Sequence, residues 1–153
     1  MGAEARLLEL QLKLPPAPKP VATYLTAVRD GHLLYLSGHG PLKEDGTLHL
    51  GKLGAGLGVD EGREAARQTG LALLSTVRAN LGTLDRVVRV VKVLGLVNSA
   101  PDFTDHPNVI NGFSDLMVEV FGEAGKAARS AFGVAALPSG MAVEIEAIFE
   151  VRD

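Results

Sequence analysis

The most informative stretch of this chain runs from Arg129 to Ala147 and reads RSAFGVAALPSGMAVEIEA. Two strand-like runs, Ser130–Leu137 and Met141–Val151, lie on either side of Pro138-Ser139-Gly140. Proline, serine and glycine favour turns, since proline presets one backbone angle and glycine accepts left-handed conformations. The stretch therefore predicts two β-strands joined by a turn that either closes a hairpin or begins a short crossover.

Two charged residues stand in this apolar stretch. Arg129 opens the first predicted strand, and Glu144 falls midway along the second. A planar guanidinium suits bidentate binding of a small carboxylate, and a half-buried carboxyl group is a candidate proton carrier. The pair therefore has the parts of a site for a small organic acid. The alternative is that both are ordinary strand residues, with Arg129 paired to an acid at a solvated strand end and Glu144 on a solvent face.

The same stretch resembles the signature of the RidA/YjgF family, which is also called the endoribonuclease L-PSP family. The family pattern consists of an Ala-Arg-Ser opening, a short apolar strand, Leu-Pro and a closing Glu-Ile-Glu-Ala-Ile. In this chain these parts are Ala128-Arg129-Ser130, Leu137-Pro138 and Glu144–Ile148. Tyr24 and Ser37-Gly38 also fall in the order and spacing expected of that family.

The resemblance extends from about Pro20 to Val151, and the composition fits one domain over residues 1–153. A chain with 46% hydrophobic residues and this length can bury one core and leaves little for a second. Cysteine is absent and no apolar signal-peptide core leads the sequence, which favours a reducing cytoplasm. No apolar run approaches the ~20 residues that span a bilayer, so no membrane association is expected.

The charge balance argues against nucleic acid as a partner. The formal net charge is −3, and the chain has two Tyr, five Phe and no Trp. It therefore offers neither a basic field for phosphates nor a platform on which bases stack. The four histidines, His32, His39, His49 and His106, lack the spacing typical of metal ligands, so no metal site is predicted.

The N-terminal part of the chain reads as strands and turns. Leu7–Leu14 alternates apolar and polar residues as a half-buried strand does, and a proline-rich connector follows it within residues 1–19. Val21–Val28 and His32–Ser37 flank Arg29-Asp30-Gly31, in which Asp-Gly is a strong hairpin signal. Two antiparallel strands are expected there.

Two helices and a central strand follow. Val59–Leu81 repeats apolar and small residues at helical spacing, with Ala66 and Gly70 small enough for close packing on a sheet. Val87–Val97 is rich in β-branched residues, and Asn108–Phe121 is again helical. Strands at both ends with two helices between them predict an α+β domain whose mixed sheet carries two helices on one face. The arrangement resembles the chorismate-mutase-like fold of the RidA family.

The other face of such a sheet needs cover. Val87–Val97 and Met141–Val151 are apolar, or nearly so, at alternate positions on both sides, and an exposed apolar face is a liability. The resemblance implies a homotrimer in which the sheets form a closed centre and the active clefts lie between neighbouring subunits.

The resemblance also implies an activity, namely hydrolytic deamination of enamine or imine intermediates of the 2-aminoacrylate type to 2-oxo acids and ammonia. Arg129 would hold the substrate carboxylate, the Ser37-Gly38 backbone with Tyr24 and Asn111 would orient the amino end, and Glu144 would position and deprotonate water. The imine is already activated, so orientation and a proton shuttle suffice, and no metal or cofactor is expected. Partial burial beside Val143 and Ile145 would raise the Glu144 pKa.

Several residues depart from the family pattern. Ala131 stands where the family often has cysteine, the loop over residues 103–110 is longer, and His39 follows Ser37-Gly38 where glutamine is common. His39 is expected to line the cleft, to face solvent or to pack on the next strand. A Gly-rich segment over residues 51–58 matches no phosphate-binding motif and is expected to be a mobile loop near the cleft mouth.

Two other functions stay open. One is a small-carboxylate-binding or sensor protein of the same fold that performs no chemistry. The other is a ribonuclease or translation inhibitor, as the family's older name suggests. The acidic charge balance disfavours the second, and the presence of both Arg129 and Glu144 favours catalysis over binding alone.

Overall fold

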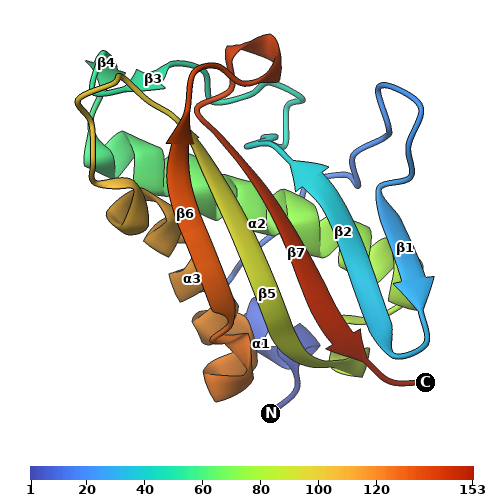
Figure 1. The fold of residues 1–153 in the computed structure, drawn as a ribbon. Helices are drawn as coiled ribbons and strands as arrows, with labels where there is room; N and C mark the ends of the chain where they lie inside the picture. Colours follow the sequence, from blue (N-terminus) through green and yellow to red (C-terminus); the bar gives the residue numbers. More distant parts are fainter.

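A five-stranded sheet covered on one face by helices forms the body of the computed structural model, which describes residues 1–153 (Figure 1). The sheet order is β1 (Ala27–Asp30), β2 (Leu33–His39), β7 (Val143–Val151), β5 (Val87–Asn98) and β6 (Ala128–Val134). The helices are α1 (Ala3–Glu9), α2 (Val59–Leu81) and α3 (His106–Phe121), and β3 (Lys52–Leu53) pairs with β4 (Gly56–Leu57). The predicted α+β class and mixed sheet are confirmed, with α1 as an additional helix.

The two C-terminal strands do not form a hairpin. β5 pairs in parallel with β6 and antiparallel with β7, so it lies between them. The chain therefore leaves β6, passes the turn at Pro138–Gly140 and crosses β5 before it enters β7. The short crossover is the outcome of the two that the sequence left open. Strand β7 begins at Val143, so Glu144 is its second residue instead of a central one.

The β1–β2 hairpin and helix α2 appear where the sequence predicts them. Gly31 adopts a left-handed φ of 62° in the two-residue turn between β1 and β2. Helix α2 has the predicted bounds because both ends are satisfied locally. The Glu61 carboxylate accepts a hydrogen bond from the Gly58 amide at 3.1 Å, and Gly82 ends the helix with a φ of 83°.

Glycines in α2 and α3 let the two helices approach each other closely. A Cβ atom on Gly70 would lie 2.7 Å from Leu116 Cδ2, and one on Gly112 would collide with the backbone carbonyl of Arg63. Small residues at a helix crossing reduce the distance between the helix axes. The closeness expected between Gly70 and the sheet is therefore a contact between α2 and α3.

The N-terminal strand prediction is wrong. The first part of Leu7–Leu14 belongs to helix α1, and the rest forms no strand. Alanine, glutamate, arginine and leucine are strong helix formers, and Ala3 and Leu7, four residues apart, are both buried. The predicted strand Val21–Val28 is likewise reduced to β1, because the residues before Ala27 form bends.

The sheet face opposite the helices is less apolar than the sequence suggested. Along β7 the residues Val143, Ile145, Ala147, Phe149 and Val151 are buried against the helices. The alternate residues on β7 are Glu144, Glu146, Ile148 and Glu150, so the expectation that this strand is apolar on both sides is wrong. Exposed apolar side chains on this open face come from the other strands, namely Val28, Tyr35 and Phe132.

The core lies between the sheet and the helices. Its largest fully buried side chains include Leu73 and Leu74 of α2, Ile110, Phe113 and Met117 of α3, and Phe149 of β7. No helix is both long enough and apolar enough to cross a bilayer.

Candidate functional site

A cleft of about 1050 Å³ lies beside β2 and β7. Four of the predicted site residues line it: Tyr24, Ser37, Gly38 and Glu144. The cleft lined by these four residues is called the glutamate cleft below. The structure therefore brings together residues that are up to 120 positions apart in the sequence, as the resemblance implied.

A β-bulge in β2 builds one wall of the glutamate cleft. Leu36 pairs with Ala147 and His39 pairs with Ile145, so Ser37 and Gly38 together oppose the single residue Glu146. An extra residue in one strand bends that strand and re-aims its side chains. The Ser37 hydroxyl donates a hydrogen bond to the Leu25 carbonyl at 2.5 Å, which ties the bulge to the segment before β1.

Glu144 lies directly against the backbone of this bulge. A Cβ atom on Gly38 would lie 2.5 Å from Glu144 Oε2, so only glycine leaves room for the carboxylate there. Burial of the half-exposed carboxyl group raises its pKa, and the negative charge of Glu146 raises it further. The predicted direction of the shift is confirmed. A carboxylate with a raised pKa is a better proton acceptor than an ordinary exposed glutamate.

Tyr24 stands at the rim of the cleft, in a segment of bends instead of the predicted strand. Its side chain is 41% exposed, and its hydroxyl oxygen accepts a hydrogen bond from the Val21 amide at 3.4 Å. In this hydrogen bond the hydroxyl oxygen is the acceptor, so the hydroxyl proton is free for a ligand or another chain.

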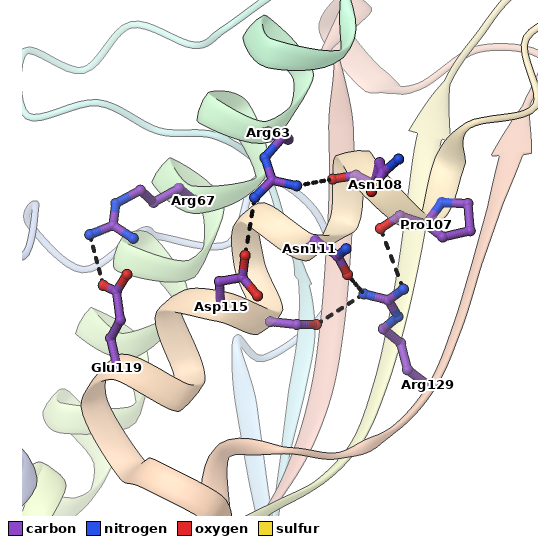
Figure 2. A network of polar contacts seen from close by, with 9 residues as sticks. Arg63, Arg67, Pro107, Asn108, Asn111, Asp115, Glu119 and Arg129 are labelled. Atoms are coloured by element: carbon purple, nitrogen blue, oxygen red, sulfur yellow. Dashed lines mark hydrogen bonds and ion pairs between the residues drawn. The ribbon is translucent and has the colours of Figure 1, made fainter.

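Arg129 and Asn111 form a second group, the arginine cluster, with Ser114 and Pro107 of α3 (Figure 2). Arg129 Nη1 donates hydrogen bonds to Asn111 Oδ1 at 2.8 Å and to Ser114 Oγ at 3.2 Å. Nη2 donates to the Pro107 carbonyl at 3.4 Å. These neutral acceptors orient the guanidinium without neutralising its charge, and its remaining N–H groups stay available for an anion.

Electrostatics around Arg129 favour an anionic ligand. Burial lowers the Arg129 pKa, while the charge of Asp115 on α3 acts in the opposite direction. Asp115 itself is paired to Arg63, with Nη2 and Oδ2 3.1 Å apart. No ion pair joins Arg129 to a carboxylate, so the predicted alternative of an acid-paired strand-end arginine is not what the structure contains.

The glutamate cleft and the arginine cluster lie on opposite faces of the sheet within one chain. Arg129 is level with Val93 and Ala147, whose side chains are buried against the helices. Glu144 is level with Leu96, an odd number of residues from Ala147, and therefore faces the other way. One chain thus keeps the predicted carboxylate clamp and the predicted base apart.

Two site residues were missed in the sequence. Ser114 follows Asn111 by three residues and Pro107 by seven, a spacing that puts all three on one face of a helix. That spacing could have identified Ser114 once Asn111 was chosen. Asn111 itself lies in the second turn of α3, since the helix begins at His106 and takes in part of the predicted 103–110 loop.

Three further predictions concern the surroundings. The Gly-rich segment 51–58 does not line the cleft. It contains the paired strands β3 and β4, and Leu53 within it is fully buried, so the segment is not the plain loop that was predicted near the cleft mouth. His39 lines the cleft but is 4% exposed. Ala131 lies two residues after Arg129 on β6, half-buried against the core.

No group of three or more histidine, aspartate or glutamate side chains is arranged to hold a metal ion.

Comparison with known proteins gives consistent matches along nearly the whole chain. Residues 4–147 match the family described as "YjgF/chorismate_mutase-like, putative endoribonuclease". Protein TCP17 of Trypanosoma cruzi is 47% identical over 150 residues, which are 97% of this chain and 94% of that protein. A protein named 2-iminobutanoate/2-iminopropanoate deaminase from Dermatophagoides farinae is 30% identical, over 92% of this chain and 95% of its own.

A solved structure supports the same assignment. Protein Atu1372 of Agrobacterium tumefaciens, described as of unknown function, superimposes with a TM-score of 0.90 at 39% identity. The superposition covers 98% of this chain and 92% of that one. The family model over residues 4–147 and the 47% identical relative show that the chain belongs to the YjgF/RidA family.

Proposed function

We propose that this protein hydrolyses small 2-imino acids and their enamine tautomers to the 2-oxo acid and ammonia. The observation that carries the proposal is Glu144, a half-buried carboxyl group with a raised pKa that lies against Gly38 in an open cleft. The Dermatophagoides relative, which is named 2-iminobutanoate/2-iminopropanoate deaminase, supports the same chemistry.

The proposed reaction needs one water molecule and one proton carrier. Glu144 accepts a proton from water, and the water oxygen bonds to the carbon of the C=N group while the π electrons move to nitrogen. The nitrogen receives the proton that Glu144 took from water and then the proton of the new hydroxyl group, so that the C–N bond breaks and ammonia leaves as the C=O bond forms. For 2-aminoacrylate, proton transfer to the terminal carbon first gives the imine. The sum is 2-aminoacrylate plus water giving pyruvate plus ammonia.

The substrate carboxylate is assigned to the arginine cluster of a second chain. Arg129 and Glu144 face opposite sides of the sheet in one chain, so the two ends of one small substrate require two copies. We infer a homotrimer, as in the family pattern, in which the open sheet faces with Val28, Tyr35 and Phe132 are covered by neighbouring subunits. Tyr24, with its free hydroxyl proton, would stand at the same boundary.

A binding or sensor protein is the second candidate, and the arginine cluster is the observation that favours it. Asn111 and Ser114 orient Arg129 through their hydrogen bonds, which is enough for carboxylate capture without chemistry. This candidate leaves the raised pKa of Glu144 without a role.

The test uses 2-aminoacrylate released by a serine dehydratase. Pyruvate formation is followed with the dehydratase alone, with this protein added, and with a Glu144→Gln variant added. Faster pyruvate release with the native chain and not with the variant supports the proposal. No acceleration by a folded native chain that still binds 2-oxo acids would replace it with the binding function.

A further inference from the structure

His39 is the one buried histidine of the chain, and its orientation depends on the bulge in β2. In a regular strand Leu36 and His39, three residues apart, would face opposite sides of the sheet. The extra residue between them puts both on the helix side, where Leu36 is 4% and His39 is also 4% exposed. The imidazole thus lies behind the wall that Ser37 and Gly38 present to the cleft.

The two hydrogen bonds of this imidazole fix its tautomer. Nδ1 lies 2.7 Å from the Ser37 carbonyl oxygen, which only accepts, so Nδ1 carries the proton. Nε2 lies 2.7 Å from Thr76 Oγ1 of α2 and therefore accepts from the threonine hydroxyl in the neutral ring. Burial lowers the His39 pKa, which keeps the ring neutral and this pattern intact. The ring links helix α2 to the bulge.

The bulge in turn sets the space around Glu144. Gly38 lies directly against the Glu144 carboxylate, and Ser37 is held by its hydrogen bond to the Leu25 carbonyl. A shift of the Ser37 carbonyl would move both residues relative to Glu144, since they are adjacent in the chain. Thr76 does not line the cleft, and His39, which does, is only 4% exposed and pairs on the helix side of the sheet.

We propose that His39, anchored by Thr76, is a positioning residue that holds the Ser37-Gly38 bulge against Glu144. This assignment rests on the proposed function for its kinetic consequence, but its structural content does not require any activity. The bridge from α2 to the bulge keeps the glutamate cleft narrow beside Glu144 and limits the water that reaches the carboxylate.

Thr76→Val is the sharpest variant, because it removes the hydroxyl and keeps the side-chain shape. The matched control is Thr69→Val on the same helix, since Thr69 is also buried but bonds only the Ala65 carbonyl. A second pair is His39→Leu, which loses both bonds, and His39→Gln, whose amide supplies one donor and one acceptor. Thr76→Val and His39→Leu should lower kcat roughly 10-fold with KM nearly unchanged, whereas Thr69→Val and His39→Gln should stay within about threefold of the native rate.

A second readout does not depend on activity. Carbon NMR of the Glu144 carboxyl group should show a raised pKa in the native chain and in Thr69→Val, and a pKa closer to the ordinary value in Thr76→Val, because a loosened bulge admits water. The charged groups around Glu144 are unchanged by these substitutions. They are Glu146 on the same strand, Lys19 in the lining of the same cleft and, further along the same face, Lys92 on β5, while β2 carries only the neutral His39.

Nitrogen NMR of the His39 ring should report a neutral imidazole with its proton on Nδ1. A proton on Nε2 would overturn the proposal, as would Glu144 titration in Thr76→Val that matches Thr69→Val. If the native chain shows no imine hydrolysis but both NMR results hold, the positioning role stands and the proposed function fails. If hydrolysis occurs at the same rate in Thr76→Val and Thr69→Val, the positioning role fails alone.

Discussion

Arg129 and Glu144 are prepared for their proposed roles by different physical means. The guanidinium is oriented by neutral acceptors on α3, so its charge remains available. The carboxyl group is made more basic by burial and by Glu146. The bonds to Arg129 lower the cost of ordering its side chain when a ligand binds, because the guanidinium is already held in position.

Arg129→Ala should abolish imine hydrolysis while the chain still folds. Loss of a charged clamp that is desolvated by its ligand typically costs about 2 to 5 kcal/mol of binding. Arg63→Ala is the control, because Arg63 makes similar bonds to α3, to the Asn108 carbonyl and Asp115, outside the cluster. Steady-state kinetics and thermal unfolding of both variants test this. Near-native activity of a folded Arg129→Ala chain would remove Arg129 from the site.

Glu144→Gln should lower turnover by roughly 100-fold or more while 2-oxo acid binding persists or tightens, since repulsion of the ligand carboxylate is lost. Glu146→Gln is the control on the same face of the same strand. It keeps the base and should move the acid limb of the rate profile to lower pH, because a charge that raises the Glu144 pKa is removed. Unchanged turnover in Glu144→Gln would assign water activation to another group.

The same substitution has a predicted effect on stability. The folded-state pKa of Glu144 is raised above its unfolded value. Between these two pKa values the folded chain binds more protons than the unfolded chain, so its stability falls as the pH rises through this range. Glu144→Gln should therefore raise the melting temperature at neutral pH, and the gain should vanish below the pKa of an unfolded glutamate. Melting curves at several pH values measure it, and a lower melting temperature at neutral pH would contradict it.

At the scale of elements, sequence periodicity was most reliable where a segment had both a clear pattern and a local end signal. Helix α2 has both, in Glu61 at its start and Gly82 at its end, and its bounds are as predicted. Leu7–Leu14 has an alternating pattern, but the helix-forming residues at its start form α1 instead. Strand pairing depends on partners far along the chain, which a local pattern does not contain.

The site was predictable to a similar degree. The identities of Arg129, Glu144, Tyr24, Ser37, Gly38 and Asn111 came from motif resemblance, and the structure gathers them into two groups. The glutamate cleft and the arginine cluster lie on opposite faces of the sheet because of the register of β5 between β6 and β7. That register follows from the crossover and not from any residue of the motif. The turn at Pro138–Gly140 is compatible with a hairpin as well, so the sequence left this register open.

The contact between α2 and α3 yields a prediction about stability. Gly112→Ala should destabilise the chain by about 1 to 3 kcal/mol, because the added methyl group meets backbone instead of a flexible side chain. Gly58→Ala is the control, since its Cβ would lie 3.8 Å from the nearest atom, and it should cost less than about 1 kcal/mol. Urea unfolding of both variants decides the matter. If Gly112→Ala were as stable as Gly58→Ala, α2 and α3 could move apart without a loss of stability.

At the scale of the whole molecule, the open sheet face and the separated site halves point to the same assembly. Light scattering after size exclusion should give a mass three times that of the 16.0 kDa chain. Phe132→Ser on the edge strand β6, where Phe132 is 47% exposed, should weaken association because a neighbour no longer buries the ring. A monomer at micromolar concentration with ligand binding intact would refute both the trimer and the shared site.

Complementation between two inactive variants tests the central proposal, a deaminase site shared by two copies of the chain. Arg129→Ala and Glu144→Gln chains are unfolded together in equal amounts, refolded and assayed for pyruvate release from 2-aminoacrylate, beside each variant refolded alone. If Arg129 and Glu144 come from different copies, random mixing restores about one quarter of the sites, and activity rises to that share of the native rate. Activity of the folded mixture no higher than the mean of the two variants would contradict the shared site.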